Sequence, residues 1–248
     1  MNKRFITVAL LLLGAMFIAQ GQSFTYKWER VAMDTTWMGN GTSEVEQIIA
    51  KYHPGIEDLM EIVGYSSEEM SKRNPESGLS NLAADALLYA AQPLLKEGDK
   101  ALALTNFGGI RSELPKGAIR IYDIFSVFPF DNKLVVVELP GYRIREIMER
   151  FASREKFEAL AGVEIVVKDK KLVKCKIGGK NLKNNAMYKL VTIDFLLDGG
   201  DSLNLRKDAE DIVISELFVR DGVVKYIKEK CDGGYIFNNQ PDGRIVIK

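Results

Sequence analysis

The amino-acid sequence predicts an α+β fold, with a single domain in which helices pack against a mixed β-sheet. Short apolar strands and amphipathic helices are interspersed without the regular alternation of a doubly wound sheet. No internal repeat or low-complexity linker divides the 248 residues. Hydrophobic residues make up 46% and charged residues 27%. These values are ordinary for a globular domain and exclude a disordered tail, a collagen-like fibre and a polytopic membrane protein.

The first residues are typical of an export signal. A basic start at Lys3 and Arg4 precedes an apolar run from Phe5 to Ile18, and Ala19-Gln20-Gly21 gives a small-x-small cleavage pattern. These features predict a secretory signal peptide over residues 1–21 and a periplasmic or extracellular mature protein without a stable membrane span. The alternative is an uncleaved anchor helix, for which the apolar run is short.

Residues 22–43 are expected to be irregular, and the folded domain is expected over residues 44–248. Ser43 and Glu46 have capping-box spacing, so a helix should begin here. A short helix or turn is expected around 119–125. Apolar periodicity predicts further helices at 79–95, 141–152 and 219–227. Runs of strand length lie at 60–65, 101–105, 134–139, 163–167, 172–177, 188–193 and 212–214, the fourth and fifth as a hairpin.

Charge and rare residue types limit the chemistry. The chain has 34 basic and 34 acidic residues and a formal charge of +0, so no basic excess indicates a nucleic acid polymer as partner. The single histidine, His53, excludes a histidine-rich metal site. Cys175 and Cys231 either form one disulfide in an oxidising compartment or remain two thiols. The sequence leaves both open because it does not supply their Cα separation.

The first of three polar clusters runs from Arg73 to Leu82. It places a basic side chain and backbone donors just before the helix expected at residue 79. Free N–H groups and the helix dipole favour an anion at such a position. The alternative is a helix start capped by Ser77 or Asn74, with no ligand.

The second and third clusters each follow an expected strand. Asn106-Phe107-Gly108-Gly109-Ile110-Arg111 joins paired glycines, which let a ligand approach the backbone, to an arginine able to make forked contacts to phosphate. Phe195-Leu196-Leu197-Asp198-Gly199-Gly200-Asp201 offers a ring for stacking and a carboxylate for vicinal hydroxyls. The alternative for the first of these clusters is a tight turn with an arginine on the surface. The alternative for the second is a phenylalanine that anchors the chain in the core, followed by a polar turn.

In its order of motifs, the chain from about residue 44 to its end resembles the C-terminal domain of the 5′-nucleotidase / UDP-sugar hydrolase family. The motifs begin with Arg-x-x-Glu-Ser-x-x-x-Asn-Leu at Arg73 and Asn-x-Gly-Gly-Ile-Arg at Asn106. Then come Phe128-Pro129-Phe130-Asp131-Asn132-Lys133-Leu134, Phe195 with Gly199-Gly200-Asp201, and Asp242-Gly243-Arg244-Ile245. The resemblance implies the α+β fold of that domain.

The resemblance also implies a substrate site for a nucleotide or nucleoside such as AMP. Phe130 and Phe195 look like two rings that stack on a nucleobase from either side, worth about 1–3 kcal/mol per base. Arg73 and Arg111 look like phosphate-binding arginines. Asn106 looks like the amide that binds the nucleoside, and Asp201 looks like the carboxylate that binds the ribose hydroxyls. The glycines beside them are Gly108, Gly109 and Gly200.

Three positions depart from the family pattern. Ser80 stands where glycine is usual, and Ser202-Leu203 stand where a glycine and an aromatic residue are common. Phe107 replaces a small residue, so its bulk is expected to affect the pocket.

The resemblance implies that catalysis takes place elsewhere. Full-length members carry a metallophosphatase domain with two metal ions, and its Asp-x-His, Gly-Asp-x-x-Asp and Gly-Asn-His motifs do not occur here. We therefore expect no catalytic or metal-binding residue and no cofactor in this chain, with divalent metals only in a separate metallophosphatase partner. One alternative is a free-standing nucleotide-binding or protein-interaction module. The other is an independent hydrolase using Glu76, Asp198 or Asp201 as acid and base.

Overall fold

The computed structural model describes residues 25–30 and 44–248. The predicted signal peptide over 1–21, the capping residue Ser43 and most of the segment 22–43 lie outside them. Residues 25–30 have no regular secondary structure. The helix expected after Ser43 is α2, Glu44–Tyr52. The described residues contain no helix that is long and apolar enough to cross a membrane.

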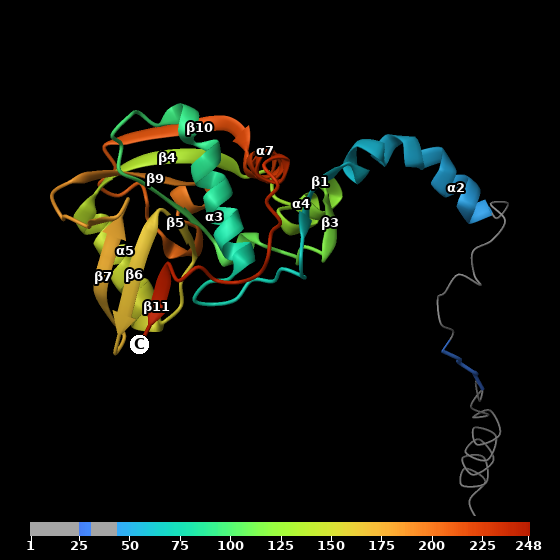
Figure 1. The fold of residues 1–248 in the computed structure, drawn as a ribbon, viewed down its shortest axis with the longest axis horizontal. Helices are drawn as coiled ribbons and strands as arrows, with labels where there is room; N and C mark the ends of the chain where they lie inside the picture. The colour runs from blue at the N-terminus through green and yellow to red at the C-terminus, as the bar shows by residue number, and fades with distance from the viewer. Residues whose placement is uncertain (1–24, 31–43) are drawn as a thin grey trace, which may run out of the picture. The chain divides into compact units, whose positions relative to one another are not determined.

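Tyr52–Lys248 form one compact unit, built around a five-stranded sheet with the order β10-β4-β9-β2-β5 (Figure 1). Only β2 and β9 run parallel, and the other pairs are antiparallel. The sheet is therefore mixed, and the predicted α+β class is confirmed. Its strands are β2 (Ala101–Thr105), β4 (Lys133–Pro140), β5 (Ala159–Ala161), β9 (Met187–Ile193) and β10 (Asp211–Phe218).

Two smaller sheets complete the unit. The predicted hairpin is confirmed as the antiparallel pair β6–β7 of a four-stranded sheet, and the C-terminal strand β11 adds parallel to β6. A two-stranded antiparallel sheet joins β1 and β3. These strands are β1 (Ile62–Ser66), β3 (Gly117–Arg120), β6 (Val163–Lys168), β7 (Lys171–Ile177), β8 (Lys180–Asn181) and β11 (Ile245–Ile247).

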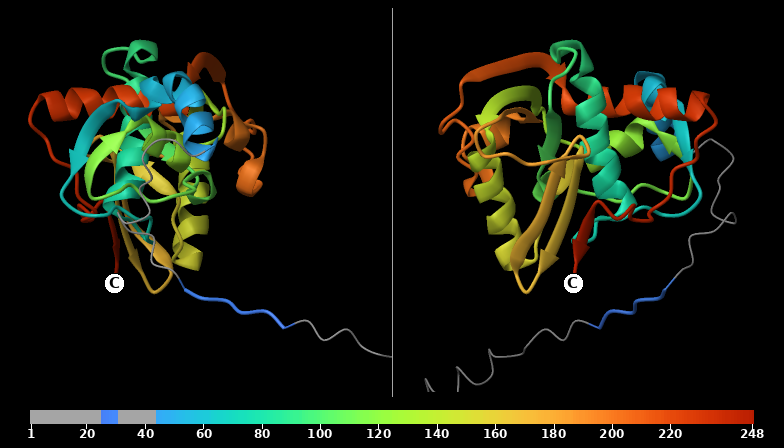
Figure 2. Two further views of the ribbon diagram at one scale, coloured as in Figure 1. Left: turned by 90° about the vertical axis from the view of Figure 1, so that its right-hand side faces the viewer. Right: turned by 60° about the vertical axis from the view of Figure 1, so that its left-hand side comes forward.

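The helices cover the sheets. Helix α3 packs against β2 and β5 and also against α7, whereas α5 packs against β4 and β7 (Figure 2). The predicted inward face of α5 is confirmed, since Ile144, Ile147, Met148 and Phe151 are all buried. The helices of the unit are α3 (Gly78–Ala90), α4 (Ile121–Val127), α5 (Gly141–Arg154), α6 (Asp194–Leu197) and α7 (Val219–Asp232).

Three points of the sequence prediction are decided by the structure. Helix α3 ends at Ala90, and Gln92–Leu94 form a 3₁₀ turn, because Pro93 has no N–H to continue the helix. The short helix or turn expected around residues 119–125 is confirmed as the helix α4, although residues 119 and 120 belong to the strand β3 that precedes it. Cys175 in β7 is buried, Cys231 in α7 is partly buried, and both are free thiols, so the disulfide alternative is wrong.

Candidate functional site

A cavity of about 230 Å³ lies where three loops meet at one edge of the five-stranded sheet. Strands β2 and β9 are parallel and both end here, and β4 is antiparallel to β9 and begins here. The residues that follow β2 and β9 and those that precede β4 are therefore brought together. The lining residues are Asn106, Gly108, Gly109, Phe130, Asn132, Phe195 and Asp201.

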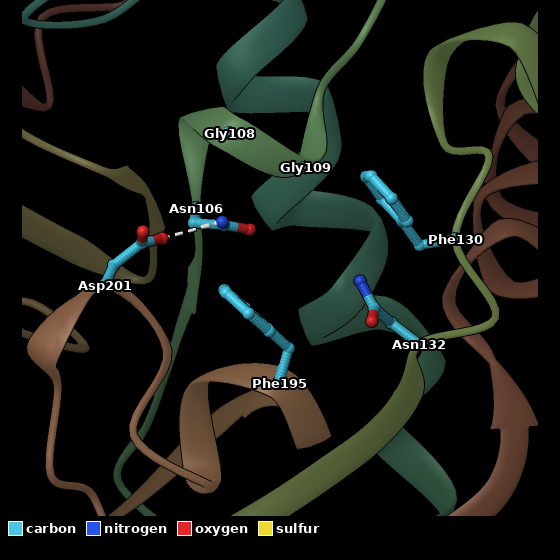
Figure 3. A pocket seen from close by; sticks show the side chains of 7 residues that line it. All are labelled: Asn106, Gly108, Gly109, Phe130, Asn132, Phe195 and Asp201. Carbon is cyan, nitrogen blue, oxygen red and sulfur yellow. Dashed lines mark hydrogen bonds between the residues drawn. The ribbon is translucent and has the colours of Figure 1, made fainter.

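Phe130 and Phe195 form the apolar walls of this cavity. Their rings project into it from different loops (Figure 3), and each residue is 48% exposed. Gly200 lies against the second ring, since a Cβ there would stand 2.4 Å from a Phe195 ring carbon. Glycine at this position therefore lets the Phe195 ring occupy its place. Stacking on a flat ligand would remove the exposed faces of both rings from water, which is favourable.

Asn106 and Asp201 form the polar wall. The Asn106 Nδ2 donates to Asp201 Oδ2 at 2.7 Å (Figure 3). Asn106 is only 5% exposed, and its Oδ1 has no hydrogen-bond partner among the described residues. A Cβ at Gly109 would stand 2.7 Å from that oxygen, and one at Gly108 would stand 3.2 Å from Nδ2. The paired glycines therefore make room for the Asn106 amide.

The two predicted phosphate-binding arginines differ in position. The Arg111 guanidinium carbon lies 6.0 Å from the centre of the Phe130 ring, and its Nη1 donates to the Gly108 carbonyl at 3.3 Å. Arg111 is exposed beside Phe130, which lines the cavity, although Arg111 itself does not line it. Arg73 is also exposed and does not line the cavity either.

The first polar cluster forms a helix cap. The Ser77 hydroxyl accepts from the Ser80 backbone N–H, and the Ser80 hydroxyl accepts from the Ser77 N–H. Ser80, which departs from the family pattern, therefore completes a capping box. Buried Glu76 accepts from the Asn81 amide and from the backbone N–H groups of Gly243 and Ile245.

The three carboxylates considered for an independent hydrolase do not meet. Glu76 is committed to the network just described. Asp198 pairs with Arg206 and does not line the cavity, whereas Asp201 does. Among the residues that the structure describes, no group of three or more His, Cys, Asp and Glu side chains is placed to hold a metal ion.

Two residues were misjudged or missed at the sequence level. Phe107 does not line the cavity, and its partly buried ring packs against the hydrophobic core. Asn132 does line the cavity, with its amide beside the two rings (Figure 3). The Pro-Phe-x-Asn segment was the available signal for Asn132, but a polar residue beside a strand has many possible roles.

Comparisons with known proteins agree with this fold. Residues 60–208 match the family described as 5′-nucleotidase, C-terminal domain. Protein UshA of Yersinia enterocolitica is 30% identical over 173 residues, which cover 68% of this chain and 30% of that protein. The trifunctional nucleotide phosphoesterase protein YfkN of Bacillus subtilis is 28% identical over 187 residues, or 67% of this chain and 13% of that protein. The chain thus spans less than half the length of these relatives.

The solved structures give the same result for the fold. The 5′-nucleotidase precursor from Thermus thermophilus superposes with a TM-score of 0.68 at 24% identity, over 82% of this chain and 42% of that one. The NAD nucleotidase of Haemophilus influenzae gives 0.63 at 19% identity, over 83% and 41%. Since the family match also covers more than half of the sequence, the chain belongs to the 5′-nucleotidase C-terminal domain family.

Proposed function

We propose that this chain binds a nucleotide or nucleoside and supplies the substrate specificity of a 5′-nucleotidase-type system. One observation supports the proposal above the others: two half-exposed phenylalanine rings enter a single cavity beside an asparagine–aspartate pair. The rings suit the faces of a nucleobase, and the Asp201 carboxylate suits the hydroxyls of a ribose.

The size of the cavity supports binding of one flat ring. Its volume of about 230 Å³ is below the range of about 300–1,000 Å³ typical for drug-sized ligands. A base would fill the space between Phe130 and Phe195, and the sugar and phosphate would extend to the rim. Arg111 is exposed beside Phe130.

Phosphate hydrolysis is assigned to a second protein. In this proposal, a separately encoded two-metal phosphatase generates the attacking hydroxide, and this chain presents the nucleotide. The relatives' names include nucleotidases and a phosphoesterase, and these proteins are much longer than the matched region. Apart from the two rings, no exposed large apolar side chain lines the cavity in the described part of the chain. A chain that docks on such a partner should expose an apolar patch beside the rings. The cavity wall does not supply this patch.

Export completes the proposal. The signal-peptide pattern over residues 1–21 supports a location in the periplasm or outside the cell. One similar protein, 30% identical over 77% of this chain, is named a cell wall protein of Listeria monocytogenes. Fractionation of cells that express the full-length chain tests this point, and recovery of the uncleaved chain in the cytoplasm would contradict it.

Calorimetric titration of the purified chain with adenosine and AMP tests the binding function. Phosphate release is assayed in the same samples with added Mn²⁺, and the Phe130→Ala/Phe195→Ala double variant is the matched control. We expect binding by the native chain, weaker binding by the variant and no phosphate release. No binding by the native chain would favour a protein-interaction module. Phosphate release by the chain alone would contradict the assignment of hydrolysis to a partner.

A further inference from the structure

Glu158 lies behind the cavity, in the segment between α5 and β5. It is partly buried and does not line the cavity. Its Oε2 accepts from the backbone N–H of Phe107 at 2.6 Å. Phe107 is the residue between Asn106 and the paired glycines, so this carboxylate holds the turn that forms one wall of the cavity.

The same turn is held from its carbonyl side by Lys72. The Lys72 Nζ donates to the Phe107 carbonyl at 2.8 Å and to the Ile110 carbonyl at 2.5 Å. A carboxylate on the N–H and an ammonium on the C=O thus fix the same residue. Hydrogen bonds to ionised groups are about twice as strong as neutral ones. Loss of the charge on either partner would therefore weaken its hydrogen bond to Phe107.

The Asp201 part of the polar wall depends on Arg150 of α5. Asp201 and Ser202 have φ angles of 50° and 59°, a left-handed conformation that is unfavourable for non-glycine residues. The Arg150 Nη2 donates to the Asp201 carbonyl and its Nη1 to the Ser202 carbonyl, both at 2.8 Å. Arg150 therefore holds the strained turn that presents the Asp201 carboxylate to Asn106.

Glu158 lies in the electrostatic field of both walls. Burial raises the pKa of its carboxyl, and the Asp201 charge adds to this increase. The Phe107 N–H and the charges of Arg150 and Lys72 act in the opposite direction, but the net pKa lies above the ordinary carboxyl value. Glu158 is thus protonated at a higher pH than an exposed glutamate.

We propose that Glu158 is a positioning residue whose ionised carboxylate keeps the Asn106–Gly109 turn aligned with the Asp201 turn, so that its protonation weakens ligand binding in the cavity. The affinity part of this inference depends on the proposed function. The alignment of the two turns depends only on the contacts of Glu158, Lys72 and Arg150.

The sign of the effect follows from the charges. Ligand hydroxyls that donate to Asp201 would reduce its negative potential at Glu158, and a bound ligand would also fix the Phe107 N–H on the carboxylate. Both changes favour ionised Glu158, so binding should lower its pKa relative to the free protein. By linkage, affinity is highest above the free-protein pKa and decreases as the pH falls through it.

The test is the affinity for adenosine, measured by calorimetry from about pH 5 to about pH 8. Adenosine has no charge that changes over this range. We compare the native chain with Glu158→Gln, whose amide oxygen can still accept from Phe107 but does not titrate, and with Glu164→Gln as a control. Glu164 is a paired carboxylate on β6 that is not part of the cavity wall.

We expect the native affinity to decrease toward low pH, and a pKa difference of about half a unit between free and bound protein would give a limiting change of about threefold. The Glu164→Gln variant should show the native profile, and Glu158→Gln should bind with an affinity independent of pH. A pH dependence that persists in Glu158→Gln would assign it to another group and overturn the inference. A native profile that is flat would also overturn it.

A second measurement needs no ligand and tests the alignment of the two turns separately from the effect on affinity. The Phe107 and Asp201 amide resonances of the free protein, followed by NMR, should titrate together with a midpoint above the ordinary carboxyl value. This titration should be absent in Glu158→Gln. Amides that do not respond would overturn the alignment by Glu158. If they respond but adenosine does not bind at any pH, the proposed function and the affinity part of the inference are wrong, and the coupling of the two turns stands.

Discussion

Two polar turns in this chain have similar composition but different roles. The segment before α3 and the segment after β2 each combine an arginine, an asparagine and glycine, and each resembles a ligand site in the sequence. At the start of α3, Ser77 and Ser80 satisfy each other, and Glu76 accepts from the Asn81 amide and from backbone N–H groups. After β2, Asn106 has an unpartnered buried oxygen beside two half-exposed rings. Polar groups that are satisfied internally stabilise the fold, and a site requires groups that are left available.

The two turns are also connected, because the first supports the second. Lys72, next to Arg73, donates to two carbonyls of the second turn. The Asn74 Oδ1 accepts from the backbone N–H of Phe157 at 2.8 Å, directly beside Glu158. The first segment therefore contributes to the cavity by holding its wall.

The largest expected effect on stability is that of Glu76→Ala. This change leaves two buried donors, the Asn81 amide and the Ile245 N–H, and the part-buried Gly243 N–H without their acceptor. The free energy of unfolding should therefore decrease by about 3 kcal/mol or more. Urea denaturation measures the decrease, and Glu149→Ala on the exposed face of α5 is the control, with a change within about 0.5 kcal/mol. Folded Glu76→Ala protein should keep its adenosine affinity. Unchanged stability with reduced affinity would place Glu76 in the site and break the comparison.

The next effect concerns the rings. Phe195→Ala and Phe130→Ala should each weaken adenosine binding by about 1–3 kcal/mol. Because each ring is half-exposed, the unfolding free energy should change by only about 0.5 kcal/mol. Tyr122→Ala, which removes a 56% exposed ring from α4, is the matched control for calorimetry. Native affinity in both phenylalanine variants would rule out stacking between them.

The helix cap predicts a smaller change. Ser77→Ala should decrease the free energy of unfolding by about 1 kcal/mol, because the Ser80 N–H loses its acceptor at the start of α3. Ser80→Ala removes the reciprocal bond to the Ser77 N–H, so the double variant should be less destabilised than the sum of the two single variants. Denaturation of all three measures the coupling. Additive losses would contradict a reciprocal capping box.

The smallest effect sharpens the comparison between the arginines. Arg111→Ala should weaken AMP binding more than adenosine binding, by about 0.2–1 kcal/mol, the range of exposed charge pairs. Arg73→Ala, measured beside it, determines whether the first turn also contacts phosphate. Equal losses for AMP and adenosine in Arg111→Ala would show that this arginine does not recognise phosphate.

Several elements could be predicted from the sequence because their pattern is local. The strand over residues 101–105, the hairpin of β6 and β7 and the buried face of α5 all follow from apolar periodicity. The three-residue strands β5 and β11 could not be predicted, since they are defined by their partners in the sheet. The exclusion of Phe107 from the cavity could not be predicted either, because its side-chain direction depends on the core residues against which it packs.

The sequence by itself determined the fold class, through periodicity, and the family, through five motifs in order. Its motifs also included six of the seven residues of the cavity wall as expected site residues. Only the tertiary structure decided which polar cluster is satisfied internally, that Asn132 completes the cavity, and that Glu158 and Lys72 hold the Phe107 peptide. The physical reason is that hydrogen-bond satisfaction depends on partners far apart in the chain: Glu76 with Gly243, Asn106 with Asp201, and Lys72 with Phe107.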